Sequence, residues 1–115
     1  MRQLLVIILN REDHLDDILA ELLELEVPGA TVVEGVALER VLAKDVPIFA
    51  GLLQSTRESR AYNKNIFALI PGRETALRLI DVLRGMGIDL SDPSTGQLFT
   101  LPIDFWLSAE GPSAD

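Results

Sequence analysis

The sequence predicts an α+β domain in which a four-stranded antiparallel sheet carries two helices on one face. Short apolar runs typical of strands alternate with stretches whose apolar residues recur at helical spacing. The order along the chain is strand, helix, strand, a long connection, and then strand, helix, strand. The chain has 115 residues, 48% of them hydrophobic, so one domain with a sizeable core is expected.

The first half of the pattern opens with an apolar strand. Residues 4–9 form a continuous apolar run rich in β-branched side chains, which predicts a buried strand. The next apolar residues follow the spacing of an amphipathic helix, at Leu15, Ile18, Leu19, Leu22 and Leu23. We expect Asp13 to cap this helix. Residues 30–36 predict the second strand.

The second half repeats the same order of elements. Residues 65–70 predict a third strand. A second amphipathic helix follows, with its apolar positions at Ala76, Leu79, Ile80 and Leu83. Residues 89–96 have the composition of a loop, and residues 97–103 predict the last strand. Pro102 indicates that this strand lies at the sheet edge or ends there.

Two such halves in this order match the split βαβ, or ferredoxin-like, arrangement. We expect residues 1–104 to form a single domain with a connection, residues 37–63, inserted between the second and third strands. Residues 105–115 are expected to form a C-terminal tail. Because the strands carry apolar residues on both parities and the helices cover one face only, we expect a neighbouring subunit to cover the other face.

The inserted connection, residues 37–63, is unusually apolar and is expected to be partly helical. One helical face would carry the apolar residues Ile48, Phe49, Leu52 and Leu53. Two interpretations are open, because this set either packs within the assembly or is presented to a partner. Arg57, Arg60 and Lys64 form a modest basic cluster, which is either ordinary surface charge or a contact for an anion.

Charge and composition exclude several functions. The net charge of −8 opposes binding to nucleic acid or to an anionic lipid surface. No run of eighteen apolar residues exists, so we expect no membrane insertion. The absence of cysteine excludes disulfides and thiolate catalysis and fits a cytoplasmic protein. No basic residue follows Arg84, so a cationic C-terminal segment is ruled out.

Few residues of the sequence are candidates for catalysis or for metal binding. The only histidine, His14, falls in a first helical turn, where an exposed bystander is the simpler interpretation. A transition-metal site would need more nitrogen or sulfur ligands. Asp89 and Asp92 are candidates for a carboxylate pair or a hard-cation site, although turn formation explains them better. We therefore expect no metal site and no enzyme activity.

Three stretches resemble the PII nitrogen-regulatory signalling proteins. They are LDDI starting at Leu15, GATVVE starting at Gly29, and TGQLFTLPI starting at Thr95. The order and spacing of the elements also agree along residues 1–104. The resemblance implies a non-catalytic ferredoxin-like homotrimer that binds an adenine nucleotide in the clefts between subunits. It also implies a long loop that docks on a partner such as a membrane transporter or an enzyme.

The resemblance also implies roles for individual residues. Thr31 matches a position that lines the adenine pocket in the family, and the turn before the last strand matches at Thr95, Gly96 and Gln97. Lys64 is the nearest remaining cation and joins them as a candidate ligand-binding residue. The candidate partner-docking residues belong to the inserted connection: Ile48, Phe49, Leu52, Leu53, Arg57 and Arg60.

The chain departs from the family where phosphates would bind. The family places a lysine after the turn glycine, where this chain has Gln97, and arginines after the last strand, where this chain reads FWLSAEGP from Phe105. About three charge-assisted contacts of roughly 1.5–3 kcal/mol each are thus missing. We expect a divergent member without tight ATP binding, so AMP, a cyclic nucleotide or no nucleotide stays open. A structural trimeric scaffold, or a small-ligand enzyme on the same fold, is the alternative function.

Overall fold

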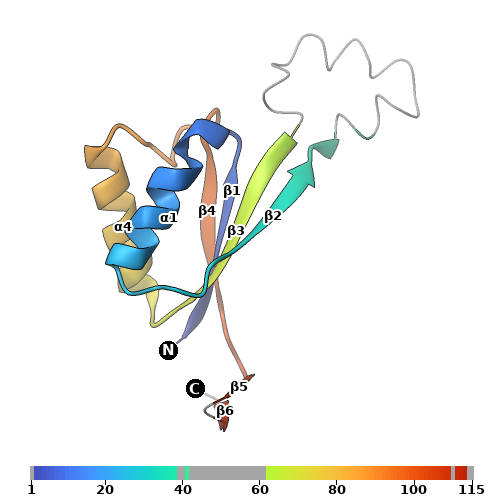
Figure 1. The fold of residues 1–115 in the computed structure, drawn as a ribbon, viewed down its shortest axis with the longest axis vertical. Coiled ribbons are helices and arrows are strands. Elements are labelled where there is room, and N and C mark those ends of the chain that lie inside the picture. The colour runs from blue at the N-terminus through green and yellow to red at the C-terminus, as the bar shows by residue number, and fades with distance from the viewer. Residues whose placement is uncertain (1, 39–40, 42–61, 110, 114–115) are drawn as a thin grey trace.

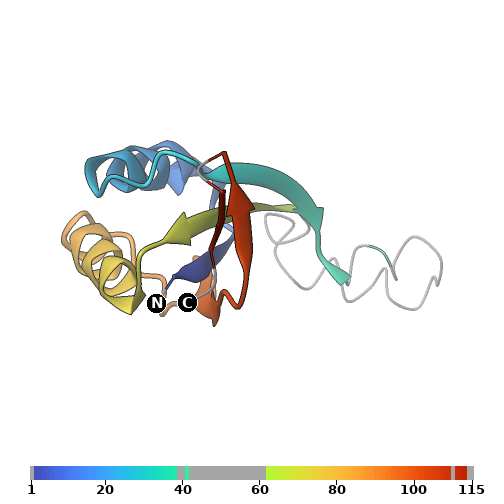
Figure 2. The same cartoon turned by 90° about the horizontal axis from the view of Figure 1, so that it is seen from below.

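The main feature of the fold is one antiparallel sheet with two helices on one side. The computed structural model describes residues 2–38, 41, 62–109 and 111–113. The strand order is β2-β3-β1-β4, with β1 (Gln3–Leu9), β2 (Thr31–Val36), β3 (Tyr62–Ile70) and β4 (Gly96–Pro102). Both α1 (Leu15–Glu24) and α4 (Arg73–Gly85) lie on the same side of it (Figures 1 and 2). The predicted α+β class is therefore confirmed, and the arrangement broadly fits a ferredoxin-like fold.

Strand β1 lies at the centre of the sheet, between β3 and β4. Its pairing with both neighbours is antiparallel: Val6 lies opposite Phe67 on one side and Phe99 on the other. Directly paired residues share a face and successive residues alternate between faces. Leu5, Ile7 and Leu9 therefore share the face that the helices cover. The other parity of β1 points to the side without helices.

The core fills the space between the sheet and the helices. Its members come from β1, β3, the inner faces of both helices and the segments that follow the helices. They are Leu5, Ile7, Leu9, Ile18, Leu22, Val27, Ile66, Ala68, Ile70, Ala76, Leu79, Leu83, Ile88 and Leu90. All are aliphatic, as the sequence with its few aromatic residues implies. Burial of this set positions both helices on one face, because the hydrophobic effect scales with the apolar area removed from water.

The start of α1 differs from the prediction. A short 3-10 helix, η1 (Glu12–His14), precedes α1, and His14 occupies its N-cap without a side-chain cap. The prediction that Asp13 caps this helix is wrong. The Asp13 carboxylate instead accepts hydrogen bonds of 3.2 and 2.9 Å from the Arg11 guanidinium. A charged partner two residues away thus competes successfully with the backbone N–H groups for this carboxylate.

Both helices end in the same hydrogen-bonded turn, but with different residues. In α4 the N–H groups of Gly87 and Ile88 donate back to Arg84 and Leu83, and Gly87 has a φ of +84°. The same pattern closes α1, where Glu26 occupies the equivalent position with a φ of +63°. This is the Schellman motif, which favours glycine because a Cβ is strained at positive φ. Glu26 is therefore held in a backbone conformation that costs stability.

A small hairpin forms within the segment predicted to be a tail. Strands β5 (Trp106–Ser108) and β6 (Gly111–Ser113) pair with each other beyond the end of β4 (Figure 1). The guanidinium of Arg2 lies 3.7 Å from the centroid of the Trp106 ring. This cation–π contact joins the hairpin to the start of β1.

The inserted connection stays largely a prediction. Strand β3 already begins at Tyr62, so residues 62 and 63 belong to the sheet and not to the connection. The helices expected within residues 37–63 fall mostly outside the described residues. Pro102 is the last residue of β4, an edge strand, as its missing N–H predicts.

The core can be tested by truncation of one leucine on α4. Leu79 is fully buried, so Leu79→Ala should lower the free energy of unfolding by about 2–5 kcal/mol through a cavity between α4 and the sheet. Leu77, on the exposed face of the same helix, is the control, and Leu77→Ala should change stability by less than about 0.5 kcal/mol. Urea denaturation followed by circular dichroism measures both. Equal losses would contradict the assigned helix face.

Candidate functional site

The largest candidate surface is the side of the sheet that carries no helix, which we call the open face. It is formed by residues of one parity on all four strands: Leu4, Val6, Ile8, Val33, Phe67, Leu69, Phe99 and Leu101. The outer members are solvent-exposed, with 42% for Leu69, 40% for Phe99 and 48% for Leu101. A contiguous apolar surface of this kind marks an interaction site in a soluble protein.

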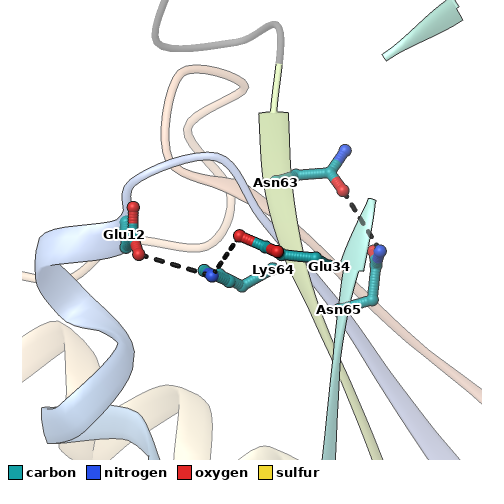
Figure 3. Close-up of polar contacts among 5 residues, drawn as sticks. All are labelled: Glu12, Glu34, Asn63, Lys64 and Asn65. Carbon is teal, nitrogen blue, oxygen red and sulfur yellow. Dashed lines mark hydrogen bonds and ion pairs between the residues drawn. The ribbon is translucent and has the colours of Figure 1, made fainter. Parts of the chain in front are cut away.

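A polar border limits the open face toward the end of the sheet where β2 ends and β3 begins. Asn65 Nδ2 donates a 3.1 Å hydrogen bond to Asn63 Oδ1, and both side chains come from β3 (Figure 3). Gly35 lies opposite Asn63 on β2, and a Cβ there would overlap this amide pair. The glycine thus leaves room for the two amides. An apolar centre with an amide border is the arrangement that protein interfaces use.

Most of the candidate ligand-binding residues meet at one end of the sheet. We call it the insertion end, because β2 ends and β3 begins there on either side of the inserted connection. One row across the four strands contains Gly96, Leu9, Lys64 and Glu34. Thr95 precedes Gly96 and is buried, while Gln97 follows it and is exposed. The structure therefore places Lys64 and the turn before β4 at the same end of the sheet, with β1 between them.

Lys64 is already bound to two carboxylates. Its ammonium lies 2.7 Å from Glu34 Oε1 and 3.4 Å from Glu12 Oε1 (Figure 3). The hydrogen bond from Lys64 lowers the pKa of Glu34, and the same bond raises the pKa of Lys64. The pair joins β2 to β3, and Glu12 adds η1 to it. Because both anions compete with any ligand anion, this lysine is a weak candidate for a phosphate contact.

The turn before β4 is held by its own aspartates. Asp89 Oδ1 accepts hydrogen bonds from the N–H and the hydroxyl of Ser91, and Asp92 Oδ1 accepts the equivalent pair from Ser94. The two hydrogen bonds from Ser91 lower the pKa of Asp89. Both are Asx turns, in which the side chain imitates a backbone turn. The carboxylates therefore serve the loop, which agrees with turn formation as their simpler explanation.

Gly96 fixes how the turn enters β4. Its φ is +153°, and a Cβ at this position would overlap the carbonyl oxygen of Ile8 on β1. Asn10 adds two bonds to the turn, since its N–H donates to the Thr95 oxygen at 2.8 Å and its Nδ2 to the Pro93 oxygen at 3.3 Å. Close backbone approach therefore explains the glycine without a ligand.

Thr31 does not join this group within one chain. It pairs with Phe67, three residues along β3 from Lys64, and lies on the open face, whereas Lys64 lies on the opposite face. Three residues of strand span about 10 Å. The candidate docking residues lie outside the described residues, so the structure places none of them: Ile48, Phe49, Leu52, Leu53, Arg57 and Arg60.

Comparison with protein-family models and with curated proteins finds no match for this chain. No group of three or more metal-ligating side chains gathers among the residues that the structure describes. Within the same residues, no helix is both long and apolar enough to cross a membrane.

Sequence reasoning missed the pairing of Arg2 with Trp106. More than one hundred residues separate the two, and no local pattern connects them. The hairpin around Trp106 was equally hidden, because Gly111 and Pro112 are residue types depleted in strands. The one available signal was Trp106 itself, which lies between Phe105 and Leu107, since a large aromatic residue favours a packed position.

Gly96→Ala should destabilise the protein by more than about 2 kcal/mol. The added Cβ must displace the backbone of β1 at Ile8. In addition, the φ of +153° at this position is strained for alanine. Gly85→Ala is the matched control, because a Cβ there meets nothing and alanine favours the helix by roughly 0.5–1 kcal/mol. Thermal unfolding of the two variants should shift in opposite directions. A tolerated Gly96→Ala would show that β4 does not start as described.

Glu34→Gln should remove part of the acid sensitivity of folding. The lowered pKa of Glu34 means that its ion pair with Lys64 stabilises the fold at every pH above 4.5, the ordinary pKa of a glutamate. That stability is lost as pH falls through the lower pKa of the folded state. The variant should therefore be less stable than the parent at neutral pH, and the difference should vanish once the pH lies below the pKa of Glu34 in the folded state. Glu24→Gln, at an exposed position on α1, is the control for the loss of one surface carboxylate.

Proposed function

We propose that the protein is a PII-like regulatory subunit that acts without catalysis as a homotrimer. The open face is the observation that carries this proposal. A sheet with helices on one side only leaves the other side to be covered, and here that side is apolar at its centre and polar at its border. Copies of the same chain are the simplest cover, since symmetric self-assembly is the commonest state of soluble oligomers. The number three comes from the resemblance to the PII family.

The position of the inserted connection supports regulation over a purely structural role. The connection leaves the sheet between β2 and β3 at the insertion end, which is where the PII family carries its docking loop. Its composition, with Ile48, Phe49, Leu52 and Leu53, suits contact with a protein partner. We propose that this partner is a transporter or an enzyme whose activity the trimer controls.

The effector is proposed to bind in the clefts between subunits. Thr31 lies on β2 and Gln97 on β4, and these are the two outer strands of the sheet. Head-to-tail contact around a three-fold axis brings one outer strand of a subunit near the other outer strand of its neighbour. Binding there would shift the population of docking-competent conformations. Thr31, Thr95, Gly96 and Gln97 are the proposed contacts.

The charges around the insertion end limit which effector fits. Lys64 is held by two carboxylates, and the turn before β4 carries Asp89 and Asp92. These negative charges disfavour the binding of a triphosphate. We propose an adenine nucleotide with a single phosphate group, AMP or a cyclic nucleotide. If no nucleotide binds, the scaffold function is favoured, while the enzyme alternative would need Asp89 and Asp92 to leave their turns.

The assembly can be tested through the open face. Leu101→Glu places a charge on the part of the open face that β4 contributes. It should convert a trimer of about 38 kDa, three times 12.6 kDa, into smaller species. Leu23→Glu is the matched control, because Leu23 is more exposed and lies on α1, away from the open face. Light scattering after size-exclusion chromatography gives the masses. A parent protein that is monomeric at micromolar concentration would contradict the trimer.

Calorimetric titration tests the effector. AMP or cyclic AMP should bind at least as tightly as ATP, because the extra phosphates of ATP meet no free cation in the described turn and approach two aspartates. Binding of ATP about tenfold tighter than AMP, equivalent to about 1.4 kcal/mol, would contradict the proposed charge preference. No heat with any of the three at millimolar concentration would leave the trimeric scaffold as the function.

A further inference from the structure

A hollow of about 610 Å³ lies at the end of the sheet opposite the insertion end. Its walls come from the connection between α1 and β2, the end of β3 and the β5–β6 hairpin. Pro28, Leu69 and Pro71 give it apolar walls, while Arg2, Glu26 and Trp106 bring one cation, one anion and an indole ring. Hollows of roughly 300–1,000 Å³ with a few polar groups are typical of small-molecule sites. This hollow involves none of the residues assigned to the subunit clefts.

The stacking of Arg2 on Trp106 orients the cation of this hollow. The stack occupies the flat face of the guanidinium, at 3.7 Å from the ring centroid. The five N–H donors of a guanidinium lie in its plane and point away from the ring. The edge of the guanidinium is therefore the side at which a carboxylate would pair with Arg2. The stack also reduces the side-chain entropy that a ligand would otherwise have to remove.

Glu26 is the anionic residue of the hollow, and its backbone conformation lowers the stability of the fold. It occupies the Schellman position of α1 with a φ of +63°, where the matching turn of α4 has Gly87. A non-glycine residue in this conformation is strained, and such strain gathers at functional sites. The turn is closed by backbone groups, since the N–H of Glu26 donates to the Leu23 oxygen at 3.0 Å and the N–H of Val27 to the Leu22 oxygen at 2.8 Å. The glutamate thus needs a reason other than closing the helix.

We propose that this hollow binds a small zwitterion with an apolar body, of the class of an α-amino acid with an aliphatic side chain. The carboxylate of the ligand would pair with Arg2 and its ammonium with Glu26. Its aliphatic part would lie against Pro28 and Pro71, because Leu69 also belongs to the open face that we propose a neighbouring subunit covers. Opposite charges on a rigid apolar pocket select for a molecule that carries both charges at one end, because a single charge leaves one wall unpaired.

Tryptophan fluorescence gives a readout confined to this hollow, since Trp106 is the only tryptophan of the chain. Titration of the full chain with L-leucine should change the emission saturably below about 10 mM. L-leucinamide lacks the carboxylate and N-acetyl-L-leucine lacks the ammonium, so each should bind at least about tenfold more weakly. An absence of saturable change with leucine, or equal binding of the three compounds, would overturn the proposal.

Two variants of the same segment sharpen the test. Glu26→Gln keeps the shape of the side chain and should weaken leucine at least about tenfold, with little effect on N-acetyl-L-leucine. Glu24→Gln, an exposed carboxylate two residues earlier, should bind leucine as the parent does. Glu26→Gly should raise the melting temperature by relieving the positive φ while losing leucine binding. Unchanged leucine affinity in Glu26→Gln would assign the glutamate no part in binding and contradict the site.

Discussion

The structure depends on a central strand that is apolar on both sides. Leu5, Ile7 and Leu9 of β1 are buried under the helices, and Leu4, Val6 and Ile8 alternate with them toward the open face. Two helices can cover only one side of a four-stranded sheet. The same sequence run that builds the core therefore creates an apolar surface on the other side, and the outer positions on β3 and β4 enlarge it. The proposed self-association would cover this surface, and the proposed clefts depend on that self-association.

The two ends of the sheet differ in chemistry. At the insertion end, close backbone approach explains Gly96, Asx turns hold Asp89 and Asp92, and ion pairs hold Lys64. A neighbouring subunit or a partner would have to add the rest of a site there. The opposite end holds a hollow within one chain that is lined by one cation, one anion and an indole ring. A regulator built in this way would separate the surface that meets its partner from one place where a small molecule is sensed.

The elements with strong periodicity could be predicted from the sequence, and contacts between distant residues could not. The apolar run of β1 and the spacing on α1 and α4 are local signals, so their type and approximate bounds were correct. The cap at Asp13 failed because Arg11 offered a stronger partner. Lys64 was recognised as a cation, but its two carboxylates come from β2 and η1, and only the fold brings them together. The hairpin had Trp106 as its one local signal, and the strain at Glu26 had none.

The central claim, that copies of the chain cover the open face, is tested most directly by solvent access to its methyl groups. Methyl-labelled native protein would be measured with a soluble paramagnetic agent in the solvent. The account predicts that the methyls of Leu69 and Leu101 relax as slowly as those of buried Leu79, although one chain alone leaves them half exposed. Relaxation as fast as that of Leu77, on the outer face of α4, would show an open face bare in solution and contradict the account.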